Sequence, residues 1–265
     1  MGIGADGVEV RPIEHDPEHT IGRPREREVG ERGVAIGTLP KRRSRPLRGR
    51  AAEGNSPAVR KLRGVAGPVV LLVCGSLQAT SANRRALDVI AERLAELGAV
   101  VEDSIALVGV PAFDPGRTSG PVVDALRQQI ADSVAVVIAT PEYAGGMAGL
   151  LKNALDWIVG SGELYGKPAV VVSAGTSGGE HARGDLVRTL TWQGAHVVDE
   201  LAIAAPRTKT DDAGRYTEQG TVAALRRLAD VVLAVPDLDG ADRLRLVRKV
   251  TARIGIGPEH IAPLI

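Results

Sequence analysis

The chain is short of cysteine and of aromatic residues. Its 265 residues include 1 Cys, 1 Phe, 3 Tyr and 2 Trp, and aromatic residues make up only 2% of the total. Because Cys74 is the single cysteine, an intrachain disulfide and a cysteine-based metal site are both excluded. A lone cysteine also fits a reducing compartment, where thiols stay unpaired.

Long apolar runs are missing as well. No run approaches the roughly 18 residues that a membrane-spanning helix needs. The N-terminus lacks the apolar core of a secretory signal, and it carries too many acids for a mitochondrial transit peptide. We therefore expect a soluble, cytoplasmic protein without a membrane partner.

The first 63 residues differ from the rest of the chain in charge balance and in apolar patterning. They hold 14 Lys and Arg against 9 Asp and Glu, and they show no sustained apolar periodicity. Such a segment buries too little apolar surface to offset its ordering entropy, so we predict that residues 1–63 form a disordered basic extension. Its basic cluster Lys41–Arg50 is compatible with nucleic-acid contact. Interleaved acids and the absence of aromatic residues before Phe113 favour a solvated extension instead.

From Gly67 onward, strand and helix patterns alternate. Continuous apolar runs at Val69–Cys74 and Val134–Ala139 are typical of strands buried on both faces. Further strands are predicted at 100–101 with 105–108, in a weaker form, and at 170–172 and 197–204. Apolar residues at helical spacing predict helices over 83–97, 121–130, 149–159, 181–193 and 219–233.

This alternation predicts an α/β fold. Five repeats indicate a flavodoxin-like, doubly wound, five-stranded parallel sheet of order 2-1-3-4-5, with helices on both faces, over residues 64–236. Residues 237–265 fall outside the pattern. They are expected to form a C-terminal extension with one helix, Asp242–Arg253.

The loop Gly75–Arg84 follows the first predicted strand. In the order 2-1-3-4-5 the ligand crevice opens between strands 1 and 3, so this loop borders it. The loop is rich in hydroxyl groups and leads into a helix, whose first N–H groups would cradle a phosphate. The alternative is plain helix capping by Ser and Asn. With no Lys and only one Gly, the loop fits neither G-x-x-x-x-G-K-[ST] nor G-x-G-x-x-G.

The loop after Ala139 is the second border of the crevice. It ends in Ala144-Gly145-Gly146, a tip almost without side chains, against which a planar ring would lie. The alternative is a tight turn that needs glycine torsions. A third small, polar loop, Ser173–Arg183, follows the next strand and neighbours the crevice.

Taken together, these motifs resemble the NAD(P)H-dependent FMN reductases. The resemblance rests on Gly75-Ser76-Leu77…Ser81…Asn83, on Thr140-Pro141-Glu142-Tyr143, and on Gly149…Lys152-Asn153-Ala154-Leu155-Asp156-Trp157, and it covers roughly Gly67 to Val235. These flavoproteins have the flavodoxin fold and are related to quinone, azo-dye and chromate reductases. The resemblance implies FMN as cofactor and NAD(P)H as electron donor, with hydride passing to flavin N5 and then to an acceptor. Quinone, azo compound, metal oxyanion and free flavin all remain open as acceptors.

The resemblance also assigns residues by position. The FMN phosphate would be held by Ser76, Gln78, Ser81, Ala82 and Asn83. The isoalloxazine ring would lie against Pro141, Glu142, Tyr143, Ala144 and Gly145, with Ser173, Gly175 and Gly178 on its other side. The helix containing Lys152–Trp157 is expected at a homodimer or homotetramer interface, although its spacing favours a core position for Trp157.

No catalytic residue and no metal ligand are expected, because the flavin carries the chemistry. His181 and His196 are isolated in the sequence, and Glu142 is expected to bond backbone in its own loop. The choice between NADH and NADPH stays open, since no dinucleotide fingerprint is present.

Three positions depart from the family pattern. Gln78 stands where the family usually has Arg, so a charged partner for the phosphate is missing there. Arg84 and Arg85 are near enough to compensate, or else they lie on the solvated helix face. Ala144-Gly145-Gly146 replaces Asn-Gly-Ser, and Ala148 replaces Pro. Two other hypotheses therefore stay open: a flavodoxin-like electron carrier that does not turn over NAD(P)H, and a binding or regulatory module with a degraded flavin site.

Overall fold

A computed structural model describes residues 67–257 and 261 of the chain. The basic extension predicted over residues 1–63 lies outside the described residues. The strands are β1 (Val69–Cys74), β2 (Val100–Asp103), β3 (Ala135–Ala139), β4 (Glu142–Tyr143), β5 (Gly146–Met147), β6 (Pro168–Gly175) and β7 (His196–Ala204). The helices are α1 (Ala82–Glu96), α2 (Pro121–Asp132), α3 (Gly149–Asp156), α4 (Glu180–Trp192), α5 (Gln219–Ala234) and α6 (Gly240–Thr251). Short 3₁₀ turns include η1 (Leu107–Gly109), η2 (Pro206–Lys209) and η4 (Ala252–Ile254).

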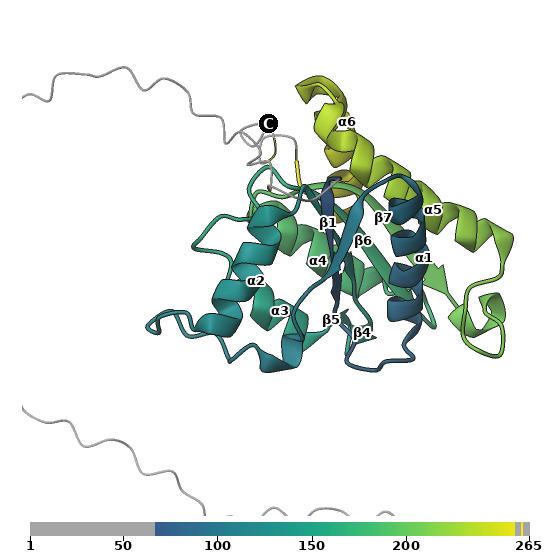
Figure 1. Cartoon of the computed structure of the whole chain (residues 1–265), viewed down its shortest axis with the longest axis horizontal. Coiled ribbons are helices and arrows are strands. Elements are labelled where there is room, and N and C mark those ends of the chain that lie inside the picture. Colours follow the sequence, from purple (N-terminus) through teal and green to yellow (C-terminus); the bar gives the residue numbers. More distant parts are fainter. Residues whose placement is uncertain (1–66, 258–260, 262–265) are drawn as a thin grey trace, which may run out of the picture. The chain divides into compact units, whose positions relative to one another are not determined.

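Five strands form one parallel sheet in the order β2-β1-β3-β6-β7. Counting only these strands, the order is 2-1-3-4-5, so the predicted flavodoxin-like topology is confirmed. The remaining strands, β4 and β5, form a separate antiparallel hairpin. Figure 1 shows this hairpin and the turn from β1 into α1 at the same end of the sheet.

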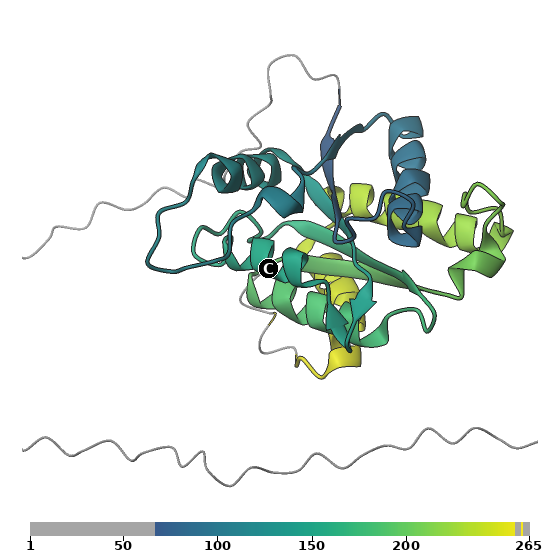
Figure 2. The same ribbon diagram turned by 90° about the horizontal axis from the view of Figure 1, so that it is seen from below.

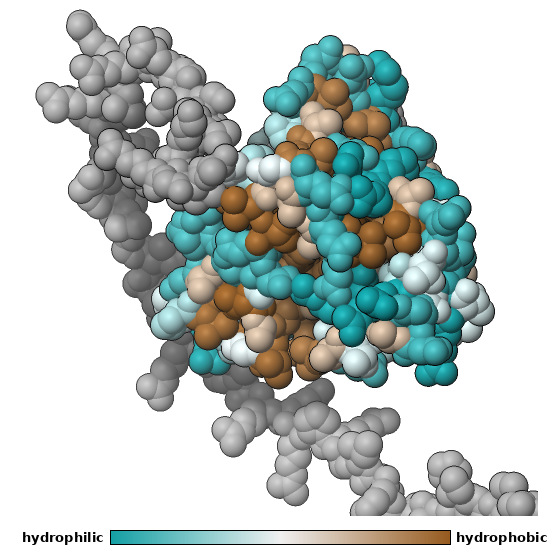
Figure 3. Space-filling model, turned by 45° about the vertical axis from the view of Figure 1, so that its right-hand side comes forward, coloured by the Kyte–Doolittle hydropathy of each residue, from teal (hydrophilic) through white to brown (hydrophobic). Residues whose placement is uncertain are grey.

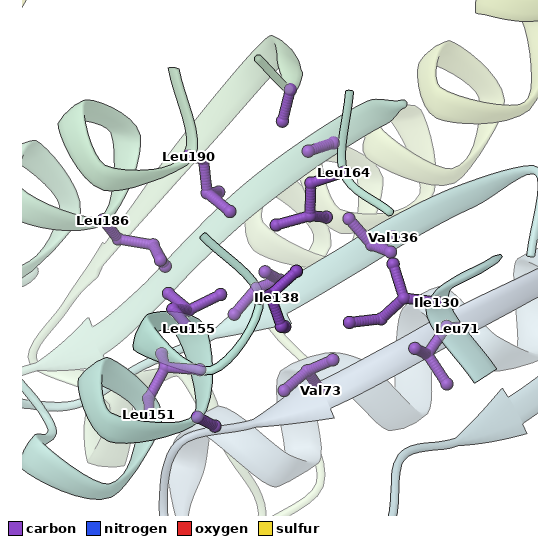
Figure 4. Packing of buried hydrophobic residues seen from close by; sticks show 14 of the residues in the cluster. Leu71, Val73, Ile130, Val136, Ile138, Leu151, Leu155, Leu164, Leu186 and Leu190 are labelled. Atoms are coloured by element: carbon purple, nitrogen blue, oxygen red, sulfur yellow. The ribbon is translucent and has the colours of Figure 1, made fainter. Parts of the chain in front are cut away.

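The sheet is buried on both faces because alternate residues of each strand enter different cores. Leu71, Val73 and Ile138 pack on the side of α2, α3 and α4. Their neighbours Val70 and Leu72 pack on the side of α1 and α5. In the close-up of Figure 4, leucines of α3 point toward Val73 and Ile138 on the strands. Continuous apolar strands are therefore the expected consequence of a sheet covered by helices on both sides.

The second strand region is shorter than predicted. β2 ends at Asp103, and the apolar stretch after it turns into η1 instead of continuing as a strand. The backbone N–H of Ile105 donates to Gln129 Oε1 of α2 at 2.9 Å, which turns the chain away from the sheet. Leu107 then enters the core as part of that turn.

β6 is longer than predicted and takes in the start of the third polar loop. It runs from Pro168, a position that needs no ladder donor, through Ser173 and Ala174 to Gly175. Those last residues pair in parallel register with the end of β7. The loop at the crevice therefore begins after Gly175.

The predicted C-terminal helix is present as α6, which starts two residues earlier than expected. It packs against β7 and α4. Val247 of α6 joins the core on one face of the sheet and Val250 joins the core on the other. Within residues 67–257, none of the helices combines the length and the apolar character that crossing a bilayer requires.

Candidate functional site

An open cavity of about 500 Å³ lies at the carboxyl ends of the parallel strands. Figure 2 shows the domain from the end to which these strands run. Four segments line the cavity: Ser76, Gln78, Thr80, Ser81, Ala82 and Asn83 after β1; Pro141 and Tyr143 after β3; Ala174 in β6; and Pro206, Arg207, Thr210, Asp211, Asp212 and Gly214 after β7. Its volume falls within the roughly 300–1,000 Å³ of small-molecule sites. Its place is the switch point at which doubly wound sheets bind ligands.

The turn from β1 into α1 presents hydrogen-bond donors to this cavity. Gly75 N–H donates to the carbonyl of Ala139 in β3 at 2.7 Å, which ties the turn to the neighbouring strand. Ser81 is the N-cap of α1, and its hydroxyl accepts from Arg84 N–H at 3.1 Å. The N–H groups of Ala82 and Asn83, in the first turn, have no acceptor within the helix. Helix capping and anion binding are therefore compatible at this turn, because the cap leaves these donors and the positive helix end facing the cavity.

Asn83 serves the fold through its side chain. Its amide nitrogen donates to the carbonyl of Ala174 at 3.0 Å, and its amide oxygen accepts from Ala174 N–H at 2.9 Å. The residue is only 2% exposed. The amide thus joins the start of α1 to the end of β6, and what it leaves for a ligand is its backbone N–H.

The two arginines that follow are engaged with carboxylates. Arg84 bonds Asp88 at 3.0 Å and Asp103 at 2.6 Å, and Arg85 bonds Asp88 at 3.4 Å. Neither arginine lines the cavity. The expectation that they compensate for Gln78 therefore has no support in the geometry.

The bare tip after β3 is the turn of a hairpin. Ala144 and Gly145 connect β4 to β5 with φ values of 50° and 73°, the pattern of a two-residue type I′ turn. The turn therefore needs left-handed torsions, as the alternative interpretation held. Of the five residues expected beside the ring, Pro141 and Tyr143 line the cavity. Tyr143 is 60% exposed, so its ring stands at the mouth.

Glu142 faces away from the cavity and caps another helix. Its Oε2 accepts from the backbone N–H groups of His181 at 2.8 Å and Ala182 at 3.1 Å, at the start of α4. It bonds backbone, as expected, but in a segment 39 residues further along the chain. The contact holds the hairpin against α4, while the His181 imidazole is not part of it.

The end of β6 borders the cavity. Ala174 lines it, whereas Ser173, Gly175 and Gly178 do not. Ser173 is fully buried, and a Cβ on Gly179 would lie 2.0 Å from its hydroxyl oxygen. Gly179 has a φ of 64°, so both its torsion and its surroundings require glycine.

The segment after β7 was missed by the sequence analysis. Ala205 N–H donates to the carbonyl of Gly175 at 3.1 Å, and the hydroxyl of Tyr216 donates to the carbonyl of Ala82 at 3.2 Å. Tyr216 is 6% exposed, and its burial raises the pKa of its hydroxyl. These contacts fold residues 206–214 over the end of the cavity next to the turn of α1. The signal in the sequence is the polar, charged stretch that directly follows the fifth strand, at the same sheet edge as the other loops.

The motif in α3 holds a further loop in place. Asn153 donates from its amide to the carbonyl of Pro111 at 2.9 Å and accepts from Phe113 N–H at 2.8 Å. Trp157 donates from its indole to the same Pro111 carbonyl at 2.8 Å and meets the Phe113 ring edge-on at 5.2 Å. Because Trp157 is only 4% exposed, the core position favoured by its spacing is confirmed.

Comparisons with known proteins agree with this geometry. A sequence profile of the family described as NADPH-dependent FMN reductase matches residues 68–210. An NAD(P)H-dependent FMN reductase of Pseudomonas aeruginosa is 35% identical over 158 residues, which cover 56% of this chain and 84% of that protein. A quinone reductase of Escherichia coli K12 is 33% identical over 165 residues, which cover 58% of this chain and 87% of that protein.

A solved structure has the same fold. A flavoenzyme NAD(P)H:(acceptor) oxidoreductase from Paracoccus denitrificans superposes with a TM-score of 0.53 and 23% identity, covering 69% of this chain and 98% of that chain. At this identity the likeness concerns the fold alone.

Proposed function

This chain belongs to the NADPH-dependent FMN reductase family, and from that membership we propose that its cavity holds FMN for the reduction of an acceptor by NAD(P)H. The observation that carries the proposal is the cavity itself. It joins the donor-rich turn of α1 at one end to Pro141 and Tyr143 at the other. An elongated ligand with a phosphate and a planar ring fits that distribution of groups.

The phosphate end would be held by the hydroxyl groups of Ser76, Thr80 and Ser81 and by the N–H groups of Ala82 and Asn83. Gln78 would add a neutral amide. The N-terminal end of α1 contributes partial positive charge at the same place. These are the donors that an anionic oxygen requires, so the residues present fit a phosphate monoester.

The ring end would lie beside Pro141 and the exposed Tyr143. Bound FMN would supply the hydride chemistry between NAD(P)H and the acceptor. The chain's own part is to orient the ring and leave one of its faces open at the mouth of the cavity. No side chain among the cavity residues stands out as a general acid or base, because the two carboxylates there, Asp211 and Asp212, lie on the segment beside the turn of α1.

A quinone is the acceptor class that we propose. One relative, from Escherichia coli, is named a quinone reductase, and a quinone is flat enough to stack at an open mouth beside Tyr143. Free flavin shares that planarity. A comparison of steady-state kcat/KM for a benzoquinone, free FMN and an azo dye under air-free conditions ranks the classes.

The test of the proposed function is spectroscopic. The full chain is purified, mixed with FMN, freed of unbound flavin and titrated anaerobically with NADPH and then NADH. Bleaching of bound flavin, and its return when a quinone is added, is expected. Bound flavin that neither donor reduces, together with a stable one-electron state on chemical reduction, would instead identify an electron carrier. A chain that takes up no FMN would be a binding module.

We also propose that the chain forms a homodimer or homotetramer. Val159, Tyr165 and Trp192 are 61%, 60% and 66% exposed, and they lie after α3 and at the end of α4. Gln193 joins these segments by donating to the carbonyl of Leu155 at 3.1 Å. Apolar side chains also gather in patches on the face shown in Figure 3. Exposed apolar surface of this kind favours self-association. Size exclusion with light scattering tests it, and a monomer at micromolar concentration would contradict it.

A cytoplasmic location is proposed on the basis of the single unpaired cysteine, Cys74. Cell fractionation tests it.

A further inference from the structure

We propose that Arg207 supplies the positive charge that binds the phosphate monoester of the cofactor. The proposal rests on the proposed function, since it assumes that this cavity is the FMN site. It concerns a residue outside the turn of α1, in η2 after the last strand of the sheet. In this chain the charged partner would come from the segment after β7 and not from the turn of α1.

Arg207 is the one cationic side chain among the described residues that line the cavity. The other lining residue at the phosphate end with a long side chain, Gln78, is uncharged. Arg84 and Arg85 are engaged by Asp88 and Asp103. Within the described part of the chain, the Arg207 guanidinium takes part in no hydrogen bond or ion pair. It is therefore available to an anionic ligand, and its planar fork matches a phosphate.

The turn that carries Arg207 is fixed to the phosphate end of the cavity. Ala205, directly before it, has a φ of 46°, a left-handed torsion that costs a non-glycine residue about 1 kcal/mol or more. Its N–H donates to Gly175 at 3.1 Å, which holds that torsion. At the other side of the turn, the carbonyl of Lys209 accepts from the N–H groups of Thr217 and Glu218.

Tyr216 completes the attachment to α1. Its hydroxyl donates to the carbonyl of Ala82, a residue of the turn that would hold the phosphate. A backbone bridge joins Tyr216 to Thr210, three residues after Arg207. The arginine is thus presented by a braced turn beside the donors of α1, which lowers the entropy lost when it binds a ligand.

Two carboxylates on the same segment shape the electrostatics. Asp211 accepts from the backbone and the side chain of Arg215, both at 2.9 Å, and this hydrogen bonding lowers its pKa. Its charge is therefore balanced locally. Asp212 has no such partner among the described residues, so its carboxylate would repel an anion in the cavity. Arg207 and Asp212 should consequently act on phosphate binding with opposite signs.

The experiment compares FMN with riboflavin, which has the same ring and lacks the phosphate. Dissociation constants of the full apo chain are measured for both by quenching of flavin fluorescence. Arg207→Gln is expected to raise the dissociation constant for FMN about tenfold, because one partly exposed charge-assisted contact is lost. The dissociation constant for riboflavin should stay unchanged. Lys209→Gln is the matched control. It removes the same charge from the same turn at a residue that does not line the cavity, so FMN affinity should change less than about twofold.

Two further variants test direction and rescue. Asp212→Asn should lower the dissociation constant for FMN about twofold to threefold, because one repulsive charge is lost. The dissociation constant for riboflavin should not change. Gln78→Arg, added to Arg207→Gln, should restore most of the lost FMN affinity by placing a positive charge on the turn of α1. Thermal denaturation of each apo variant identifies any that fails to fold.

The outcomes separate the two proposals. If the unchanged chain binds neither flavin, the proposed function fails. If it binds FMN, and Arg207→Gln matches Lys209→Gln or weakens riboflavin equally, the phosphate role of Arg207 is overturned while the flavin site stands. The phosphate role of Arg207 would also be overturned if FMN affinity fell equally steeply with salt concentration in Arg207→Gln and in the unchanged chain.

Discussion

Replacing Asn83 by Ala should destabilise the fold rather than remove a ligand contact. The change deletes both hydrogen bonds to Ala174 and leaves an N–H and a carbonyl without partners at a residue that is 5% exposed. Each lost bond contributes about 0.5–1.5 kcal/mol, and each buried group left unpaired costs about 1–3 kcal/mol. Because Ala174 lines the cavity, water can replace part of this. The expected loss of unfolding free energy is therefore about 2–3 kcal/mol.

Urea unfolding of the apo chain measures this loss. With a slope of about 2 kcal/mol per molar, the midpoint should fall by about 1 M while the slope itself stays the same. Asn83→Asp, which keeps the shape, should be destabilised at least as much, because a carboxylate has no N–H to donate to the Ala174 carbonyl. Thr80→Ala is the control, since Thr80 is an exposed residue of the same cavity wall. It should shift the midpoint by less than about 0.2 M.

The opposite pattern would refute the reasoning. If Asn83→Ala unfolded at the same urea concentration as the unchanged chain, but bound FMN tenfold more weakly than riboflavin, its amide would be a phosphate ligand. The hydrogen bonds to Ala174 would then be incidental to the fold.

Four other substitutions have definite expected outcomes. Ala144→Asn should raise the unfolding free energy by about 0.5–1 kcal/mol, because Asn tolerates the left-handed torsion of this turn better than Ala; an unchanged melting temperature would contradict that. Glu200→Gln should lower the unfolding free energy by about 3 kcal/mol. The 7% exposed carboxylate pairs with Arg183 at 2.9 Å, and the arginine would be left without this counter-charge. Asp242→Asn, in an exposed pair, is the control and should cost under about 0.5 kcal/mol. Burial lowers the pKa of Lys167 from 10.5 to about 8, so the unfolded chain holds this proton to higher pH than the folded chain does. Unfolding free energy should therefore rise between about pH 8 and pH 10.5, and Lys167→Met should flatten that rise in urea titrations taken at each pH.

The sheet and its order follow from local patterns in the sequence. Apolar runs such as Val69–Cys74 are long enough to identify strands, and their alternation with helical spacing leaves few topologies. The prediction that the second strand continues over residues 105–108 was wrong, because the path of the chain there depends on a residue that is distant in sequence. Gln129 of α2 takes the N–H of Ile105, and no window around Ile105 contains that information.

The location of the candidate cavity also follows from a general rule of the fold. The turn of α1 and the loop after β3 were placed by the rule that crevices open where strand order reverses. That rule gives the location and not the direction of each side chain. The side chains of Asn83 and Glu142 bond backbone groups of β6 and α4, which are remote in sequence. The segment around Arg207 joined the cavity through Tyr216, whose partner Ala82 lies 134 residues earlier.

The two edges of the sheet also limit how copies of this chain can associate. At one edge, α6 contributes Val247 to one core and Val250 to the opposite core, so it must pass around the border of the sheet beside β7. At the other edge, β2 is only four residues long and ends in Glu102 and Asp103. Short strands that carry charge and edges covered by a helix both block the addition of a further strand. Both edges of the five-stranded sheet therefore oppose its extension into a second copy, and an oligomer built from helices and loops is favoured.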